Sequence, residues 1–210
     1  MAKQKVHLIM VLDCSGSMMS VREEIVRGFN SALDEWKSLD KTKLFVTRLD
    51  FSVQGTSHVR VVCQRETPSK VGHFGLETYT PQGLTNMLDA VGQAISIGTD
   101  DTLSDSVVVV ILSDGEENAS SVHTYESIAD LIGARSAMGN WTFAYVGANQ
   151  DLSKVATQLN IPIANTMNYV STANGTTGAL ASLTRSLGAH YASGATSTST
   201  FFSEENVTAV

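Results

Sequence analysis

Three short segments of the sequence bring together side chains whose oxygen atoms can bind a hard metal ion. They are Asp13-Cys14-Ser15-Gly16-Ser17, Gly83-Leu84-Thr85 and Ser113-Asp114-Gly115-Glu116-Glu117. Two carboxylates that lie close together raise each other's pKa unless a cation neutralises them. Mg²⁺ prefers near-octahedral oxygen ligands and is usually held by one or two carboxylates. The residue types therefore predict a divalent-metal site with five oxygen donors, which are Asp13, Ser15, Ser17, Thr85 and Asp114.

Magnesium is the metal that this donor set favours, with manganese or calcium as the alternatives. Carboxylate, hydroxyl and water oxygens suit such hard ions. The predicted donors include no nitrogen or sulfur atom, which argues against zinc. Gly16 allows the tight turn that directs Ser15 and Ser17 the same way.

Each segment also has an ordinary structural explanation. Ser and Asp are preferred at the N-termini of helices, so Asp-x-Ser-x-Ser could simply cap one, and Asp114-Gly115 is a common turn sequence. Glu116 and Glu117 are predicted to be solvated loop residues, and Asp89 to interact with the start of its own helix. The metal prediction therefore rests on the joint occurrence of the three segments, each at the boundary of its own predicted element.

The elements that must position these segments alternate along the chain. Apolar, β-branched runs predict strands at residues 6–12, 44–51, 58–63, 106–112, 141–146 and 161–164. Apolar residues at three- and four-residue spacing predict helices at about residues 21–39, 86–95, 125–132, 152–159 and 180–191.

This alternation indicates an α/β fold with an open, doubly wound and mostly parallel sheet of about six strands, with helices on both faces. The Gln54-Gly55 turn leaves no room for a crossover helix, so its flanking strands should form a hairpin with one antiparallel edge strand. In such sheets, ligands bind beyond the carboxyl ends of the strands, where the strand order reverses. Asp13 and Asp114 each follow a predicted strand, so the fold leads to the same residues as the chemistry.

Composition limits the classes of function. Of 210 residues, 14 are basic and 21 are acidic, giving a net charge of −7, which disfavours nucleic acid and anionic membrane surfaces as partners. The apolar run at residues 6–12 is too short to span a bilayer, and no signal-peptide cleavage site follows it, so we expect a cytoplasmic protein. We expect one domain over residues 1–192 and a flexible Ser/Thr-rich tail over residues 193–210, with a docked Phe201-Phe202 pair as the alternative.

The same segments resemble von Willebrand factor type A (vWA) domains. Three stretches are similar to signatures of that family and occur in its order: DCSGSMM at residues 13–19, YTPQGLTNMLDAVGQAI at residues 79–95 and VVVILSDGEEN at residues 108–118. The resemblance covers about residues 5–192 and implies a Rossmann-like vWA fold. Two further stretches, GFNSALDEW and YVGANQDL, resemble small standalone bacterial and phage members.

The resemblance implies a metal-ion-dependent adhesion site and a protein-interaction module without catalysis. Ser15 and Ser17 would bind the metal directly, Thr85 directly or through water, and Asp13 and Asp114 largely through water. One coordination position would stay open for a carboxylate of a partner protein, because neutral hydroxyls quench little of the metal's charge. The rim that touches the partner is predicted to comprise Gly16, Met18, Gly83, Leu84, Gly115 and Glu116.

Two other functions are open on the sequence alone. Aspartates with Mg²⁺ at the end of a sheet also describe phosphoryl-transfer or hydrolytic enzymes. Against this, the three segments contain no Lys or Arg, and the chain has neither a Gly-x-Ser-x-Gly elbow nor a phosphate-binding Gly-x-x-x-x-Gly-Lys loop. The domain could also be an accessory subunit of an ATPase or a phage assembly complex, which would differ from the first function only in its partner.

Overall fold

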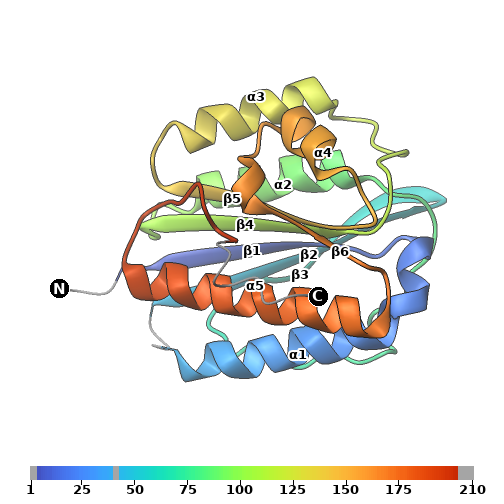
Figure 1. Ribbon diagram of the computed structural model, residues 1–210, viewed down its shortest axis with the longest axis horizontal. Helices are drawn as coiled ribbons and strands as arrows, with labels where there is room; N and C mark the ends of the chain where they lie inside the picture. The colour runs from blue at the N-terminus through green and yellow to red at the C-terminus, as the bar shows by residue number, and fades with distance from the viewer. Residues whose placement is uncertain (1–3, 40–42, 203–210) are drawn as a thin grey trace.

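A six-stranded sheet runs through the middle of the protein in the computed structural model, which describes residues 4–39 and 43–202 (Figure 1). The strand order is β3-β2-β1-β4-β5-β6. The strands are β1 (Val6–Asp13), β2 (Leu44–Gln54), β3 (Thr56–Glu66), β4 (Ser106–Ser113), β5 (Trp141–Ala148) and β6 (Thr166–Tyr169). All neighbours pair in parallel except β2 and β3, which form the predicted antiparallel hairpin at the edge. The predicted fold class is confirmed.

Helices cover both faces of this sheet. α1 (Arg22–Ser38) and α5 (Ala173–Ser193) pack on one face, whereas α2 (Met87–Asp100), α3 (Tyr125–Ser136) and α4 (Leu152–Leu159) pack on the other (Figure 1). Along β1, Leu8 and Met10 belong to the first apolar layer, and Ile9 and Val11 to the second. Successive side chains of a strand point to opposite faces, so a strand that is covered on both sides must be apolar throughout. No helix of the described residues is long and apolar enough to cross a membrane.

The strand order reverses direction between β1 and β4. From β1 the chain moves outward through β2 to β3, then returns to place β4 on the other side of β1 and continues outward to β6. Leu12 of β1 is in register with Leu112 of β4, so the carboxyl ends of the two strands lie side by side. The helices that follow them, α1 and α3, lie on opposite faces. This arrangement opens the crevice in which such sheets bind ligands.

Several predicted elements have different boundaries in the structure, and α5 begins at Ala173, seven residues before the predicted start at residue 180. The helix that the sequence predicts from residue 21 is preceded by a 3-10 helix, η1 (Gly16–Val21), which leads directly into α1. The strand predicted at residues 161–164 is wrong, because Pro162 has no N–H to donate to a strand ladder and a second 3-10 helix, η2 (Ile163–Asn165), follows it. The last strand is β6 instead, which pairs with residues 145–148 of β5.

The chain beyond α5 packs against the domain as far as residue 202. Phe201 and Phe202 are buried in the same apolar layer as α1 and α5. Phe201 N donates to Asn165 Oδ1 at 2.7 Å, and Phe202 N donates to Ala164 O at 3.0 Å. Thr198 N likewise donates to a side chain of β5, and the burial of two aromatic rings offsets the cost of ordering a polar segment. This packing differs from the predicted flexible tail; residues 203–210 lie outside the described residues, and the domain boundary at residue 192 stays a prediction.

A buried polar cluster lies at the amino-terminal end of β1, opposite the end of the sheet that carries Asp13. His7 Nδ1 lies 2.7 Å from Asp101 Oδ2, and His7 Nε2 lies 2.7 Å from Thr47 Oγ1. Arg65 Nε lies 3.0 Å from Asp101 Oδ1. Burial lowers the pKa of His7 from 6.5 to about 4 and outweighs the neighbouring Asp101 carboxylate, which raises it. The folded protein therefore holds His7 neutral at pH 7.

We expect acidification to destabilise the folded protein through His7. The unfolded chain binds a proton on His7 below about pH 6.5, whereas the folded protein binds it only near pH 4, so stability falls as the pH drops through this window. Between pH 7 and pH 5 the loss is about 2 kcal/mol. Asp13, whose pKa is raised, gains stability on acidification in the same window, so the His7 contribution is read from the difference between variants. In urea unfolding, the wild type should lose about 2 kcal/mol more than His7→Gln between pH 7 and pH 5, while His73→Gln, which removes an exposed histidine, should behave as the wild type. An equal loss in His7→Gln would contradict the prediction.

Candidate metal centre

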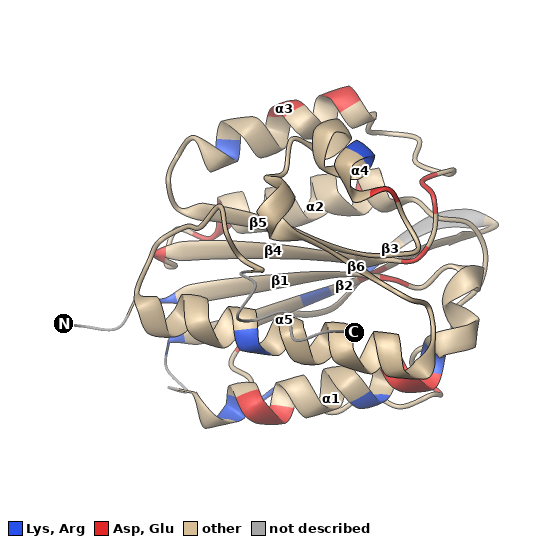
Figure 2. Ribbon diagram, viewed as in Figure 1, with Lys and Arg blue, Asp and Glu red and all other residues tan. Residues whose placement is uncertain are grey.

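The predicted oxygen donors meet at the carboxyl ends of β1 and β4. Asp13 is the last residue of β1, Ser15 and Ser17 lie where the chain enters η1, and Asp114 follows β4 directly. Ser15 Oγ lies 3.1 Å from Ser17 Oγ, and Ser17 donates a hydrogen bond of 2.5 Å to Asp114 Oδ1. Figure 2 shows acidic residues on the loops at this end of the sheet. Residues about a hundred positions apart therefore share one small site.

Gly115 marks the point that the hydroxyl groups surround. A Cβ atom built on Gly115 would lie 3.1 Å from Thr85 Oγ1, 3.4 Å from Ser17 Oγ and 3.8 Å from Ser15 Oγ. The oxygens of three hydroxyl groups, carried by two separate loops, thus border one space that no side chain fills. Such a space beside two carboxylates suits a hard divalent ion. The residues present therefore fit the metal that the sequence predicts.

The two aspartates are held as an anionic pair beneath these hydroxyls. Asp13 is fully buried, and its carboxylate accepts hydrogen bonds from Ser15 N at 2.7 Å and from Ser113 Oγ at 2.5 Å. Burial raises the pKa of Asp13 from 3.8 to about 6, with a smaller contribution from the charge of Asp114. Burial also raises the pKa of Asp114. A dication beside both carboxylates would relieve the cost of burying their charge.

The five predicted donor side chains all offer oxygen atoms. Among residues 4–39 and 43–202, no group of three or more His, Cys, Asp or Glu side chains is placed to hold a metal ion. The site combines two carboxylates with neutral hydroxyls, which is the chemistry that the sequence predicts. Burial raises the pKa of the neighbouring Cys14 thiol to about 11, so the thiol is protonated at neutral pH.

Thr85 is positioned by a long loop between β3 and α2. Gly16 N donates to Gly83 O at 3.0 Å, and Leu84 exchanges two backbone hydrogen bonds of 2.9 Å with Val53 at the end of β2. Thr85 N donates to Asn118 Oδ1 at 2.9 Å. Gly83 has a φ of +76°, and a Cβ there would lie 2.0 Å from Val53 O, so only glycine fits. These contacts fix the loop on both sides of Thr85.

Several residues that support the site were missed by sequence reasoning. Tyr79 donates a hydrogen bond of 2.6 Å to Asp13 O. Tyr145 donates to Gln150 Oε1 at 2.6 Å, and Gln150 Nε2 donates to Gly115 O at 2.9 Å. From the sequence alone these tyrosines would be assigned to the apolar core, because their spacing does not show which atom each hydroxyl group bonds. Ser113 also supports the site through its hydrogen bond to Asp13. The only feature of the sequence that indicated this role is its position next to Asp114.

Two acidic residues near the site have a structural role that the sequence did not predict. Glu117 accepts hydrogen bonds from Leu88 N at 3.0 Å, Ala119 N at 2.9 Å and Ser120 N at 2.7 Å. The prediction that Glu117 is a solvated loop residue is therefore wrong, because its carboxylate ties the loop after β4 to the start of α2. Asp89 acts similarly and accepts three backbone N–H groups of residues 121–123.

The rim of the site differs from the prediction at one methionine. Met18 is fully buried in the core, whereas Met19 is 49% exposed. Adjacent residues of a 3-10 helix point in different directions, and the first of the two faces the α1 layer. Met18 therefore cannot touch a partner. Leu84 is 53% exposed and Glu116 is exposed, Gly16 lies against Gly83, and Gly115 lies beside the three hydroxyls. Their contact with a partner stays a prediction.

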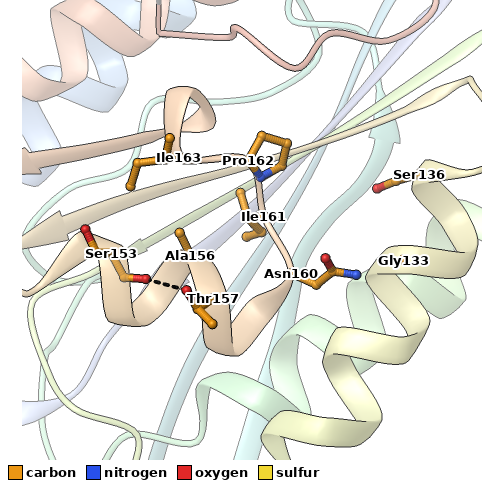
Figure 3. A pocket seen from close by; sticks show the side chains of 9 residues that line it. All are labelled: Gly133, Ser136, Ser153, Ala156, Thr157, Asn160, Ile161, Pro162 and Ile163. Atoms are coloured by element: carbon orange, nitrogen blue, oxygen red, sulfur yellow. Dashed lines mark hydrogen bonds between the residues drawn. The ribbon is translucent and has the colours of Figure 1, made fainter.

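Two cavities lie on the surface formed by α3, α4 and the loops around the metal centre. One of about 370 Å³ adjoins Asp114 and Gly115 and is also lined by Tyr125 and Lys154. It places a basic residue beside the site, which the sequence did not predict. A larger one of about 780 Å³ lies between α3 and α4, and none of its lining residues is charged (Figure 3). Only the first cavity is continuous with the metal centre.

Known proteins resemble this chain in sequence pattern and in fold. A family model described as "VWA domain containing CoxE-like protein" matches residues 2–138, which is more than half of the chain. No curated protein sequence matches significantly. The pilus adhesin SpaC of Lactobacillus rhamnosus GG, in an open conformation, superposes with a TM-score of 0.68 at 12% identity, over 87% of this chain and 30% of SpaC.

Two further structures show the same fold. The vWF domain of the type V pili tip protein Mfa5 from Porphyromonas gingivalis superposes with a TM-score of 0.67 at 9% identity, over 91% of this chain and 97% of that domain. Proximal thread matrix protein 1 from the mussel byssus, with a zinc-occupied MIDAS motif, gives a TM-score of 0.63 at 14% identity, over 85% of this chain and 47% of the mussel protein. This chain thus spans less than half of the adhesin and of the mussel protein, and at these identities the likeness concerns the fold alone.

Proposed function

Because this chain belongs to the family of VWA domains, we propose that it binds a divalent cation at the carboxyl edge of its sheet and uses that cation to bind a partner protein. The observation that carries the proposal is the convergence of three hydroxyl oxygens around Gly115, beside Asp13 and Asp114. The zinc-occupied motif of the mussel protein supports a divalent ion in a domain of this fold. Mg²⁺ is the ion we propose for the cell, with Mn²⁺ or Ca²⁺ as alternatives.

Each proposed ligand has a role that follows from its contacts. Ser15, Ser17 and Thr85 would present neutral oxygens to the ion, and Asp13 and Asp114 would supply negative charge. Ser113 and the backbone N–H of Ser15 hold the Asp13 carboxylate in place. The bound ion would supply an electrophilic centre that attracts an external carboxylate, because neutral ligands leave much of its charge unquenched.

The partner would therefore present an aspartate or glutamate at this edge. The exposed apolar side chains of Met19 and Leu84 flank the site and would pack against the surface around that acidic residue. Glu116 lies on the same rim and would repel acidic neighbours. We propose a protein partner rather than nucleic acid or a membrane, in a cytoplasmic setting.

Asp13→Asn tests metal binding directly. We expect Mg²⁺ at a hundred times its Kd to stabilise the wild type by about 2.7 kcal/mol, which raises the Tm by about 5–10 °C in a chain of this size. Asn can accept from Ser15 N through its oxygen and donate to Ser113 Oγ through its NH2 group, which reverses the direction of that bond, and it removes the charge of Asp13. This variant should therefore fold and lose most of the shift. Thermal unfolding with Mg²⁺ and with EDTA measures both, and Asp34→Asn, at an exposed ion pair, is the control. A wild type that does not respond to Mg²⁺, Mn²⁺ or Ca²⁺ would overturn the proposal.

The partner is tested by affinity capture from host lysate with Mg²⁺ and with EDTA. Proteins retained by the wild type in Mg²⁺, released by EDTA and not retained by Asp13→Asn would be metal-dependent partners. Loss of capture after removal of acidic residues from such a partner would support carboxylate binding. Retention that is equal in EDTA would contradict a metal-dependent mode.

Lys154 favours one alternative function, which is phosphoryl transfer at the same metal. It lines the cavity beside Asp114 and Gly115 and could balance phosphate charge there. No histidine lines that cavity, and two of its carboxylates, Glu117 and Asp151, accept hydrogen bonds from backbone N–H groups, so we propose binding without catalysis. Hydrolysis of p-nitrophenyl phosphate with Mg²⁺ should be no faster than buffer, and turnover that Lys154→Ala abolishes would establish the enzyme instead.

A further inference from the structure

Tyr169, the last residue of β6, has a buried hydroxyl without a hydrogen-bond partner. Its side chain is only 3% exposed, and no described residue bonds its Oη atom. Tyr79 and Tyr145, the other two buried tyrosines near the carboxyl ends of the strands, both donate hydrogen bonds of 2.6 Å. Leaving a buried hydroxyl unpaired costs free energy that phenylalanine would avoid. We therefore expect the hydroxyl of Tyr169 to form a hydrogen bond with a partner outside the described protein residues, such as a water molecule.

The register of the sheet places Tyr169 across from Asp114. Ala148 of β5 pairs with Tyr169, and Gly147 pairs with Ser113, so the next position along β4 is Asp114. Tyr169 and Ala148 belong to the same apolar layer, on the α1 and α5 side of the sheet. Only the small side chain of Ala148 stands between them, so the tyrosine ring can extend over β5 toward the metal centre.

Electrostatics agrees with this placement. Burial raises the pKa of Tyr169, and the negative charges of Asp114 and Asp13 raise it further. The hydroxyl thus lies within the field of both carboxylates, yet it forms a direct hydrogen bond with neither. Polar groups that face each other beyond direct bonding distance are commonly bridged by water.

We propose that Tyr169 is a positioning residue of the metal centre, whose hydroxyl hydrogen-bonds a water of the ion's hydration shell on the Asp114 side. This inference rests on the proposed metal function. A dication polarises its waters into strong hydrogen-bond donors, and such a water would have Asp114 as one acceptor and Tyr169 Oη as the other. Partners of this outer kind orient the groups around a metal and raise its affinity. Tyr169 would then contribute to metal affinity rather than to folding.

Tyr169→Phe separates these two roles, because it removes only the hydroxyl. We expect the affinity for Mn²⁺, measured by isothermal titration calorimetry, to fall about fivefold, as for one lost hydrogen bond. In EDTA the Tm should be equal to or higher than that of the wild type, since an unpaired buried hydroxyl has been removed. Tyr191→Phe is the matched control. Tyr191 lies in the last turn of α5, next to His190, and His190 contacts Ser106 at the start of β4, far from the carboxyl end that carries Asp114. The Mn²⁺ affinity of Tyr191→Phe should equal that of the wild type.

The outcomes distinguish this inference from the function on which it rests. No Mn²⁺ binding by the wild type would overturn both. Wild-type binding with an unchanged affinity in Tyr169→Phe would overturn the role of Tyr169 alone. A weaker affinity accompanied by a lower Tm in EDTA, or matched by Tyr191→Phe, would also overturn it, because the hydroxyl would then act through folding.

Discussion

Gly115→Ala is expected to abolish metal binding while the fold remains intact. The added methyl group would lie 3.1 Å from Thr85 Oγ1 and 3.4 Å from Ser17 Oγ, in the space that the hydroxyl groups border. Those hydroxyls cannot approach an ion and a methyl group at the same point. Gly115 does not have a positive φ, so alanine adds no backbone strain. We expect the Kd for Mg²⁺ or Mn²⁺ to rise more than a hundredfold, a loss of at least about 2.7 kcal/mol.

Calorimetry with Mn²⁺ measures the loss, and thermal unfolding in EDTA shows that the variant is folded. Gly72→Ala is the matched control, because a Cβ there meets nothing within 4 Å and the residue has no positive φ. It should bind metal as the wild type does. Wild-type affinity in Gly115→Ala would place the ion elsewhere and contradict the site, whereas a loss of folding in EDTA would show that steric conflict reaches beyond it.

The convergence of these residues at one end of the sheet could be predicted from the sequence, because the segments that carry them obey local rules. A β-branched run that ends in Ser-Asp-Gly-Glu indicates both a central strand and the polar loop after it, and the same holds for residues 6–17. Two neighbouring parallel strands that each end in an aspartate place both aspartates at the same, carboxyl-terminal end of the sheet. The alternation of elements therefore determines both the sheet and the position of the site within it.

Contacts between distant residues are what the sequence alone does not show. Whether Met18 or Met19 faces the core depends on how η1 sits on α1, and whether Glu117 is solvated depends on the start of α2 lying beside it. Phe201 and Phe202 follow a polar segment with no periodicity, yet they pack in the same apolar layer as α1 and α5. In each case tertiary packing overrides a correct reading of the local composition.

Arg48 is the clearest of these cases, since a charged residue within a predicted strand proves to be almost wholly buried. Asp50, two positions along β2 and 3% exposed, accepts two hydrogen bonds from its guanidinium, at 2.7 and 2.8 Å. The guanidinium also lies 3.6 Å from the ring centroid of Phe74. Arg60 donates both to Asp50 Oδ2, at 2.8 Å, and to Thr78 O, at 2.9 Å. Asp50 therefore connects β2 and β3 to the loop that carries Tyr79 and Thr85.

Asp50→Ala is expected to be the most destabilising single substitution considered, because it leaves the Arg48 charge buried without a counter-ion. Removing one partner of a buried ion pair typically costs about 3–5 kcal/mol, a large part of the 5–15 kcal/mol that stabilises a typical domain. Urea unfolding in EDTA measures the loss without a metal contribution, and Asp34→Ala, which breaks the exposed pair with Lys37, should cause no measurable change. A small loss in Asp50→Ala would mean that water reaches Arg48, and the pair would then not hold the loop beneath the metal centre. A large loss would show that a buried charge pair which contributes no metal ligand stabilises the part of the fold that carries this loop, because Asp50 joins Arg48 of β2 to Arg60, and Arg60 in turn bonds the loop at Thr78 O.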